Sequence, residues 1–148
     1  MSGIIGGVGS RSGVIGTTEL DYEEGNWTPE FRGSTGSAGT SVSGGAGSYV
    51  KIGKLVTIRV QANWSNKGSW TGVVQIYGLP FTVGSHAGNY GNSMMLSMVD
   101  NVSYTDPLKL YGWPSIAYLK VYEGAATALS VSDITATAYI SFTSNYEV

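Results

Sequence analysis

The chain has 148 residues, contains no cysteine and carries a formal net charge of −2. This length fits a single domain that can form a hydrophobic core, and the lack of cysteine excludes disulfides and thiolate metal sites. The charge argues against nucleic-acid binding, which needs a basic surface, and no apolar run approaches the roughly 20 residues of a membrane helix. Charged residues make up only 12% of the chain, about half the usual share, so we expect that other subunits cover much of its surface or that it belongs to a rigid extracellular particle.

Residues 1–18 are rich in glycine and contain a short repeat. The segment SGIIG at 2–6 recurs as SGVIG at 12–16. Glycine at this density disfavours an isolated helix or strand, yet the two aliphatic pairs are too apolar for a tail that stays in solvent. The sequence therefore predicts an extended N-terminal docking arm over residues 1–18, with a flexible leader as the alternative. The residues expected to insert into grooves on a neighbouring subunit are Ile4, Ile5, Val14 and Ile15.

Alternation of apolar and polar residues predicts β-strands from Trp27 to the end of the chain. The opening strand is expected at 27–31, with Trp27, Pro29 and Phe31 on one side. The clearest alternation is at 55–64, and residues 49–52 should pair with this strand through a type II′ turn at Gly53-Lys54.

Later strands follow the same alternation. They are expected at 73–77, 93–99, 108–113, 116–122 and 134–143. In the strand at 93–99, Met94, Leu96 and Met98 are expected on one face, and Pro114-Ser115 is expected to form the turn of a hairpin. About eight short strands without a helical period predict an all-β fold. We expect an antiparallel, jelly-roll-like β-sandwich over residues 19–148.

Residues with catalytic or metal-binding chemistry are sparse. The single histidine, His86, lies in a Gly/Ser-rich segment, and the pattern places no serine and carboxylate beside it as a catalytic triad requires. The acidic residues are scattered rather than paired for glycoside hydrolysis. A calcium ion at Asp21 and Glu23 stays open as an alternative, although the ligand spacing of a calcium loop is missing. We expect no enzymatic activity, no cofactor and no resident metal.

Aromatic residues are the more distinctive feature of the sequence. The chain has four Trp and ten Tyr, and several lie at or near predicted loops and strand ends. Exposed rings stack on sugars and anchor protein interfaces, whereas the alternative is that they close the ends of the sandwich. The candidate glycan or interface aromatics are Trp70, Tyr90, Tyr104, Tyr111 and Trp113.

Four motifs, in order along most of the chain, resemble structural proteins of bacteriophages. The segment MSGIIGGVGSRSGVIG at 1–16 resembles a leader of small virion proteins. The segment LDYEEGNWTP at 20–29 resembles the DYEEG-x-W/F-TP opening of a β domain found in phage tail-fibre and other structural proteins. In that domain a Y-x-K-I-G-x-L-V hairpin and a GLPF turn follow, which match YVKIGKLV at 49–56 and GLPF at 78–81. The resemblance implies a homotrimeric, jelly-roll-like module on the outer surface of a virion.

Two functions compete on this evidence. The favoured one is a trimeric capsid decoration (cement) protein that docks onto the major capsid protein through its arm, because the chain is small and lacks a coiled-coil or repeat shaft. The alternative is a short tail-fibre or receptor-binding module, attached to a tail protein, that recognises host surface glycans through aromatic loops. Neither function involves nucleic acid or a membrane as a partner. An enzyme that degrades polysaccharide is disfavoured because the chemistry is missing.

Overall fold

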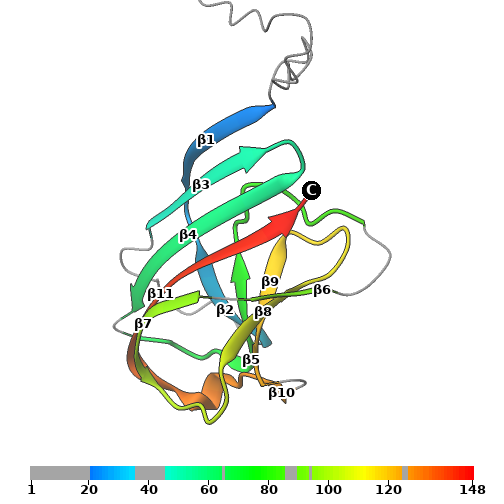
Figure 1. The fold of residues 1–148 in the computed structure, drawn as a ribbon. Helices are drawn as coiled ribbons and strands as arrows, with labels where there is room; N and C mark the ends of the chain where they lie inside the picture. The colour runs from blue at the N-terminus through cyan, green and yellow to red at the C-terminus, as the bar shows by residue number, and fades with distance from the viewer. Residues whose placement is uncertain (1–20, 36–45, 65, 86–89, 94, 125–126) are drawn as a thin grey trace, which may run out of the picture.

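The computed structural model describes residues 21–35, 46–64, 66–85, 90–93, 95–124 and 127–148. These residues form two antiparallel β-sheets that pack face to face around one hydrophobic core (Figure 1). The predicted arm with Ile4, Ile5, Val14 and Ile15 lies outside the described residues, as does His86. Within the described ranges, no helix is long and apolar enough to span a membrane.

The first sheet contains five strands among the described residues. Their spatial order is β1 (Tyr22–Trp27), β3 (Ala46–Ile52), β4 (Leu55–Trp64), β11 (Ile134–Glu147) and β7 (Met95–Val102). The longest shared ladder joins β4 to β11, from the pair Ala138–Trp64 to the pair Glu147–Leu55. This pair of long strands forms the centre of the sheet.

The second sheet has six strands within the described ranges. Their order is β2 (Glu30–Thr35), β5 (Thr71–Tyr77), β9 (Tyr118–Glu123), β8 (Leu108–Gly112) and β6 (Tyr90–Ser93), and β10 (Thr127–Ala128) pairs with β9. A short 3₁₀ helix, η1 (Val131–Asp133), precedes β11. The chain crosses between the sheets repeatedly, as in a jelly roll, while the hairpins β3–β4 and β8–β9 stay within one sheet. The predicted antiparallel β-sandwich is confirmed.

The hydrophobic core lies between the two sheets, and the inward-facing side chains of β4 and β11 form one side of it. On β4 the residues Val56, Ile58, Val60 and Ala62 are buried, and on β11 the same holds for every second described side chain from Ile134. Burying a side chain of this size contributes about 1.5–3 kcal/mol, so these strands supply much of the stability. Facing them from the second sheet are Phe31, Val74, Ile76, Leu110, Leu119 and Val121.

The predicted turn at Gly53-Lys54 is confirmed and lies where both ends of the described body meet. Gly53 adopts φ of 58°, while Lys54 is not among the residues with positive φ, which is the φ pattern of a type II′ turn. The Gly53 N–H donates to the Asp21 carbonyl at 2.7 Å, and the Val148 N–H donates to the Lys54 carbonyl at 2.9 Å. The first strand therefore starts, and the last strand ends, beside one two-residue turn.

The second predicted hairpin is also confirmed, with shorter strands. β8 and β9 pair in register from Leu108–Glu123 to Gly112–Leu119. The turn at Pro114-Ser115 is closed by a bond from the Ile116 N–H to the Trp113 carbonyl at 3.3 Å. Ser115 adopts a left-handed φ of 63° to make this turn.

Two segments that were each predicted as one strand are divided between two strands, so these two predictions are wrong. Residues 27–31 are divided, because Trp27 ends β1 in the first sheet and Glu30 begins β2 in the second. Trp27, Pro29 and Phe31, which were expected on one side of a single strand, are all buried, but Pro29 has no N–H to continue a ladder. The chain changes sheet at this point.

Residues 93–99 are divided in the same way. Ser93 ends β6 in the second sheet, and Met95 begins β7 in the first. Met98, expected on one face with Met94 and Leu96, is 55% exposed, and the side chain of Leu96 lies outside the described part. The register between β7 and β11 shifts beside Ser141, and a bulge of this kind moves side chains to the opposite face. Met94 lies outside the described residues.

Candidate functional site

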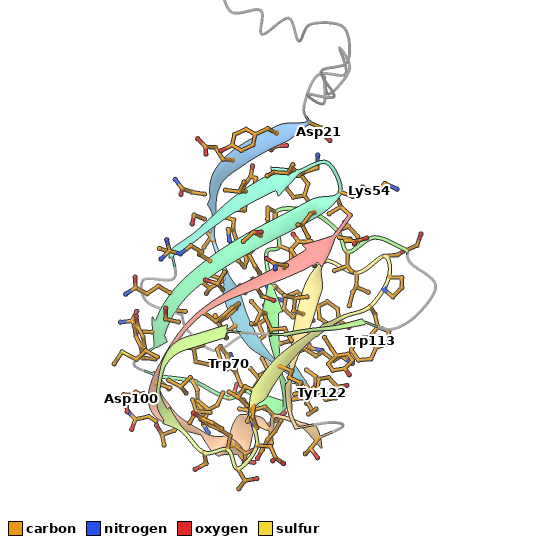
Figure 2. All side chains as sticks on the ribbon, in the orientation of Figure 1. Asp21, Lys54, Trp70, Asp100, Trp113 and Tyr122 are labelled. Carbon is orange, nitrogen blue, oxygen red and sulfur yellow. The ribbon has the colours of Figure 1, made fainter. Side chains whose placement is uncertain are left out.

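The structure separates the five predicted surface aromatics. Trp70 is only 6% exposed and belongs to the core, so its assignment as a glycan or interface residue is wrong; it packs between the sheets just before β5. Tyr104 is 43% exposed in the loop between β7 and β8. Tyr90 begins β6, opposite Gly112, but its side chain lies outside the described part. Tyr111 and Trp113 lie in contact, and Trp113 is well separated from Trp70 (Figure 2).

The outer surface of β8 and β9 carries a cluster of rings. Burial alternates along both strands, so that Leu110, Leu119 and Val121 face the core while Tyr111 and Lys120 face outward opposite each other. The outward positions of the second sheet carry aromatic and cationic side chains. We call this surface the aromatic face, which consists of Arg32, Tyr77, Lys109, Tyr111, Trp113, Tyr118, Lys120 and Tyr122.

Three rings of the aromatic face pack against one another. The centroid of Tyr111 lies 4.8 Å from that of Tyr122 and 6.0 Å from that of Trp113, and Trp113 lies 6.2 Å from Tyr122. Their planes are tilted by 40° to 56°. The Lys120 ammonium lies 4.6 Å from the Trp113 ring centroid, within the range of a cation–π contact. The cluster is therefore a group of half-buried rings with a positive charge beside it.

A second group of the aromatic face lies on β2, β5 and β9. Tyr77 stacks on Tyr118 with centroids 4.7 Å apart and planes 27° apart, and the Arg32 guanidinium lies 4.8 Å from the Tyr77 centroid. Arg32 binds Glu30 with two hydrogen bonds, one of 2.6 Å from Nε. These bonds raise the pKa of Arg32, and its charge is balanced by that carboxylate.

The Tyr77 phenol is held in its neutral form. Burial is the main cause that raises its pKa, and Tyr118 and Glu30 raise it further while Arg32 opposes them. Its hydroxyl donates to Gln75 Oε1 at 3.0 Å, and Gln75 itself is only 4% exposed. The second group is therefore tied to the sheet by hydrogen bonds as well as by packing.

Sequence reasoning found Tyr111 and Trp113 but missed their partners Tyr118, Lys120 and Tyr122. These three residues occupy alternate positions of the strand predicted at 116–122. The signal was present in the alternation, because a strand whose inward positions are Leu119 and Val121 must present the other positions outward.

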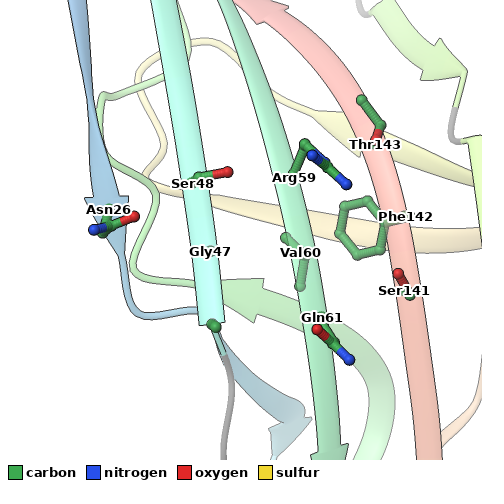
Figure 3. Close-up of a pocket in the computed structure, with 10 residues that line it drawn as sticks. Asn26, Gly47, Ser48, Arg59, Val60, Gln61, Ser141, Phe142 and Thr143 are labelled. Atoms are coloured by element: carbon green, nitrogen blue, oxygen red, sulfur yellow. The ribbon is translucent and has the colours of Figure 1, made fainter.

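The opposite outer surface, on the first sheet, holds a shallow polar groove (Figure 3). Its volume is about 230 Å³. Cross-strand pairing explains its shape, because small residues on β3 and β11 flank longer side chains on β4. One row across the strands is Asn26, Ser48, Arg59 and Thr143, and the next is Ala46, Gln61 and Ser141. The groove contains amides, hydroxyls and one guanidinium but no exposed ring.

Residues of three of the quoted motifs meet in one network at the side of the sandwich. Lys51 Nζ lies 2.7 Å from Asp21 Oδ2, and the Tyr49 hydroxyl donates to Glu23 Oε1 at 2.7 Å. The Phe81 ring lies 5.3 Å from that of Tyr49, nearly perpendicular to it, and 5.7 Å from Lys51 Nζ. These motif residues therefore join β1 to β3 and β3 to the turn after β5. Among the described residues, no group of three His, Cys, Asp or Glu could hold a metal ion.

Comparison with known proteins shows a likeness of fold to a solved structure. No protein-family model matches the chain, and no curated protein matches it. The fold is similar to that of the Dettilon tailspike protein (gp208), whose crystal structure superposes with a TM-score of 0.64 at 16% sequence identity. The match covers 85% of this chain and 24% of the tailspike chain. This chain thus spans about a quarter of the length of that protein, and the likeness is one of fold.

Proposed function

We propose that this chain is a non-enzymatic structural module of a bacteriophage particle, displayed on the outside of the virion as part of its tail. The likeness to a tailspike over 85% of the chain is the observation that carries the proposal. The order of the motifs at 1–16, 20–29, 49–56 and 78–81 supports it independently, because each of them resembles phage structural proteins.

The contacts of the motif residues support a structural role over a catalytic one. Asp21 and Glu23 bind Lys51 and Tyr49 within the chain, which uses these carboxylates to hold strands together. A catalytic carboxylate pair would instead face a cleft at a separation suited to substrate. The motifs therefore specify the sandwich rather than a reacting centre.

A capsid decoration (cement) protein is the second candidate. It is favoured by the compact body, because the described residues form a sandwich without a shaft that would give a tail fibre reach. In both cases we propose a homotrimer as the working unit. Its partner would be a tail protein in the first case and the major capsid protein in the second.

The location on the particle tests both candidates. Purified virions would be imaged by electron microscopy after labelling with antibodies against the chain, and its copy number would be measured by quantitative mass spectrometry. Label confined to the tail, with few copies, is the expected result. Label over the whole capsid with many copies would favour decoration, and absence of the chain from purified particles would refute a virion role altogether.

A further inference from the structure

We propose that the aromatic face binds an acidic saccharide, meaning a sugar chain that carries carboxylate, sulfate or phosphate groups. The inference deepens the proposed function, since a module on the outside of a virion meets the glycans of its host. It rests on the rings and on the charge of this face, which are independent of where on the particle the chain resides.

The rings supply the contact to the sugar. Aromatic side chains combine a large apolar surface with a polar tip, and the C–H groups of a sugar ring pack against such surfaces. Along β9, Tyr118, Lys120 and Tyr122 follow one another on the same face at roughly 7 Å intervals, with Tyr77 beside the first and Tyr111 beside the second. The aromatic face therefore forms a track that is longer than one sugar ring.

The charge selects an acidic sugar. Arg32 is neutralised by Glu30, so it adds little net charge. Lys120 lies in the middle of the track, and Lys109 lies opposite Tyr122. Among the described residues, no ion pair joins Lys109 or Lys120 to a carboxylate, unlike Arg32 and Lys51, which pair with Glu30 and Asp21. An anionic group on the ligand would fill that role.

The composition of the face favours a sugar over a second protein. The outward positions of β8 and β9 carry Lys109 and Lys120 among the rings and no aliphatic side chain. Aromatic residues are enriched at protein interfaces, but lysine is depleted there, so the two lysines favour an anionic sugar. The large hydrophobic side chains that are most exposed in the described chain lie elsewhere, at Tyr22, Ile52, Leu55, Met98 and Tyr104. A second copy of the chain on the aromatic face is the alternative that the experiment must detect.

The test uses the purified full chain and polysaccharides matched in backbone. Binding to dextran sulfate and to neutral dextran would be compared by affinity electrophoresis and calorimetry, and polygalacturonate would separate carboxylate from sulfate recognition. We expect the protein to bind at least one acidic polymer and to bind dextran at least about tenfold more weakly. Equal binding to the charged and neutral polymers, or no binding to either acidic polymer, would overturn the proposal.

Variants locate the site. Trp113→Ala should weaken acidic binding about tenfold, and Lys120→Gln should reduce the preference for the acidic polymer while retaining the rings. Arg59→Gln is the matched control, because it removes one exposed cation from the groove on the opposite sheet. Loss of binding in Arg59→Gln but not in Lys120→Gln would show simple charge attraction at the groove and refute the assignment.

Two further readouts keep the result unambiguous. Melting temperatures identify a variant that fails to fold, and Lys120→Gln, at an outward position, provides the test if Trp113→Ala unfolds. Light scattering reports the oligomeric state, and a change to smaller species in either variant would mean that a second copy covers the aromatic face, which overturns the proposal. Failure of saccharide binding leaves the tail placement intact, because that placement is tested on the virion itself.

Discussion

Single polar side chains of this protein fasten loops to strands. The Tyr146 hydroxyl, on β11, donates to the Phe81 carbonyl at 3.1 Å and accepts from the Phe81 N–H at 3.3 Å. Tyr146 is only 2% exposed, and burial raises its pKa to about 12 although the hydrogen bond to Phe81 opposes this effect. One phenol thus satisfies both backbone groups of the turn that follows β5.

Replacing Tyr146 with Phe should remove both bonds and lower the free energy of unfolding by about 1–3 kcal/mol, measured by urea denaturation. The pH dependence provides a second readout. Because the folded pKa of about 12 lies above the ordinary value of 10.0, the hydroxyl contributes its stability fully below pH 10 and loses it as the pH rises towards 12. The variant should therefore lose less stability than the wild type over that interval. Parallel curves for the two proteins would contradict this account.

Glu123 plays a comparable role for the loop before β8. Its carboxylate accepts a hydrogen bond from the Thr105 hydroxyl at 2.6 Å and further bonds from the backbone N–H groups of Thr105 and Asp106. These bonds lower the pKa of Glu123, and the Thr105 side chain makes the largest contribution. A single ionised group therefore organises the loop that also carries Tyr104.

We expect Glu123→Gln to reduce the acid sensitivity of this region. A folded pKa below the ordinary 4.5 means that the carboxylate stabilises the fold above that pH and that this contribution is lost as the pH falls through the folded value. The variant should show faster amide exchange at Thr105 and Asp106 at neutral pH. Its melting temperature should also depend less on pH below 4.5 than that of the wild type. Unchanged exchange at both amides would argue that other contacts hold the loop.

At the scale of the strand, the effect of a mutation on stability depends on whether the side chain faces the core or the solvent. Ile58 is fully buried in the centre of β4, whereas its neighbour Arg59 faces solvent. Ile58→Asp should lower the free energy of unfolding by several kcal/mol, because it buries an unpaired charge. Arg59→Asp, one residue further along, should change it by less than about 0.5 kcal/mol. Chemical denaturation compares the two, and similar losses would show that the facing of β4 is wrong.

Sequence alternation predicted the faces of β4 and β11 and both hairpins because these features depend on local pattern and on turn residues. It could not show which sheet a strand joins. The divided segments at 27–31 and 93–99 each change sheet midway, at Pro29 and between Ser93 and Met95. At the first crossing, Trp27 and Phe31 are buried on either side of it. Alternation alone therefore merges two strands into one.

The candidate site shows the same division between local and tertiary information. Trp70 lies next to a predicted strand end, as a surface aromatic would, but it is buried in the hydrophobic core. Tyr111 and Tyr122 are eleven positions apart and meet only because β8 and β9 form a hairpin. The strand predicted at 116–122 contained the information on facing, whereas the contacts among rings and Lys120 required the register of the sheet.

At the scale of the molecule, the two outer surfaces differ in chemistry. The first sheet presents the polar groove, and the second presents the aromatic face (Figures 2 and 3). The described residues of the core cluster run from Trp27 onwards, and we expect the sandwich to fold without the predicted arm. A body with an independent core can be separated experimentally from the segment proposed to dock it.

Deleting residues 2–16 should therefore leave the melting temperature of the sandwich within a few degrees of the wild-type value while abolishing incorporation into particles. Incorporation would be measured by supplying the truncated chain to particles that lack the protein and analysing the purified virions. A leader in which Ile4, Ile5, Val14 and Ile15 are replaced by Ser is the matched control for length. Normal incorporation of either variant would refute the docking role.

The turn at Gly53-Lys54 has a mechanical consequence. Asp21 and Val148 bond to adjacent residues of that turn, so whatever holds the chain by either end holds it from the same pole. A force that pulls Asp21 and Val148 apart would break the hydrogen bonds sequentially, starting at this turn. It would not load all the bonds of a strand pair at the same time. If neighbouring subunits hold Asp21 and Val148 together, however, the force passes between these two residues without crossing the sandwich, and the opposite end of the sandwich carries no force.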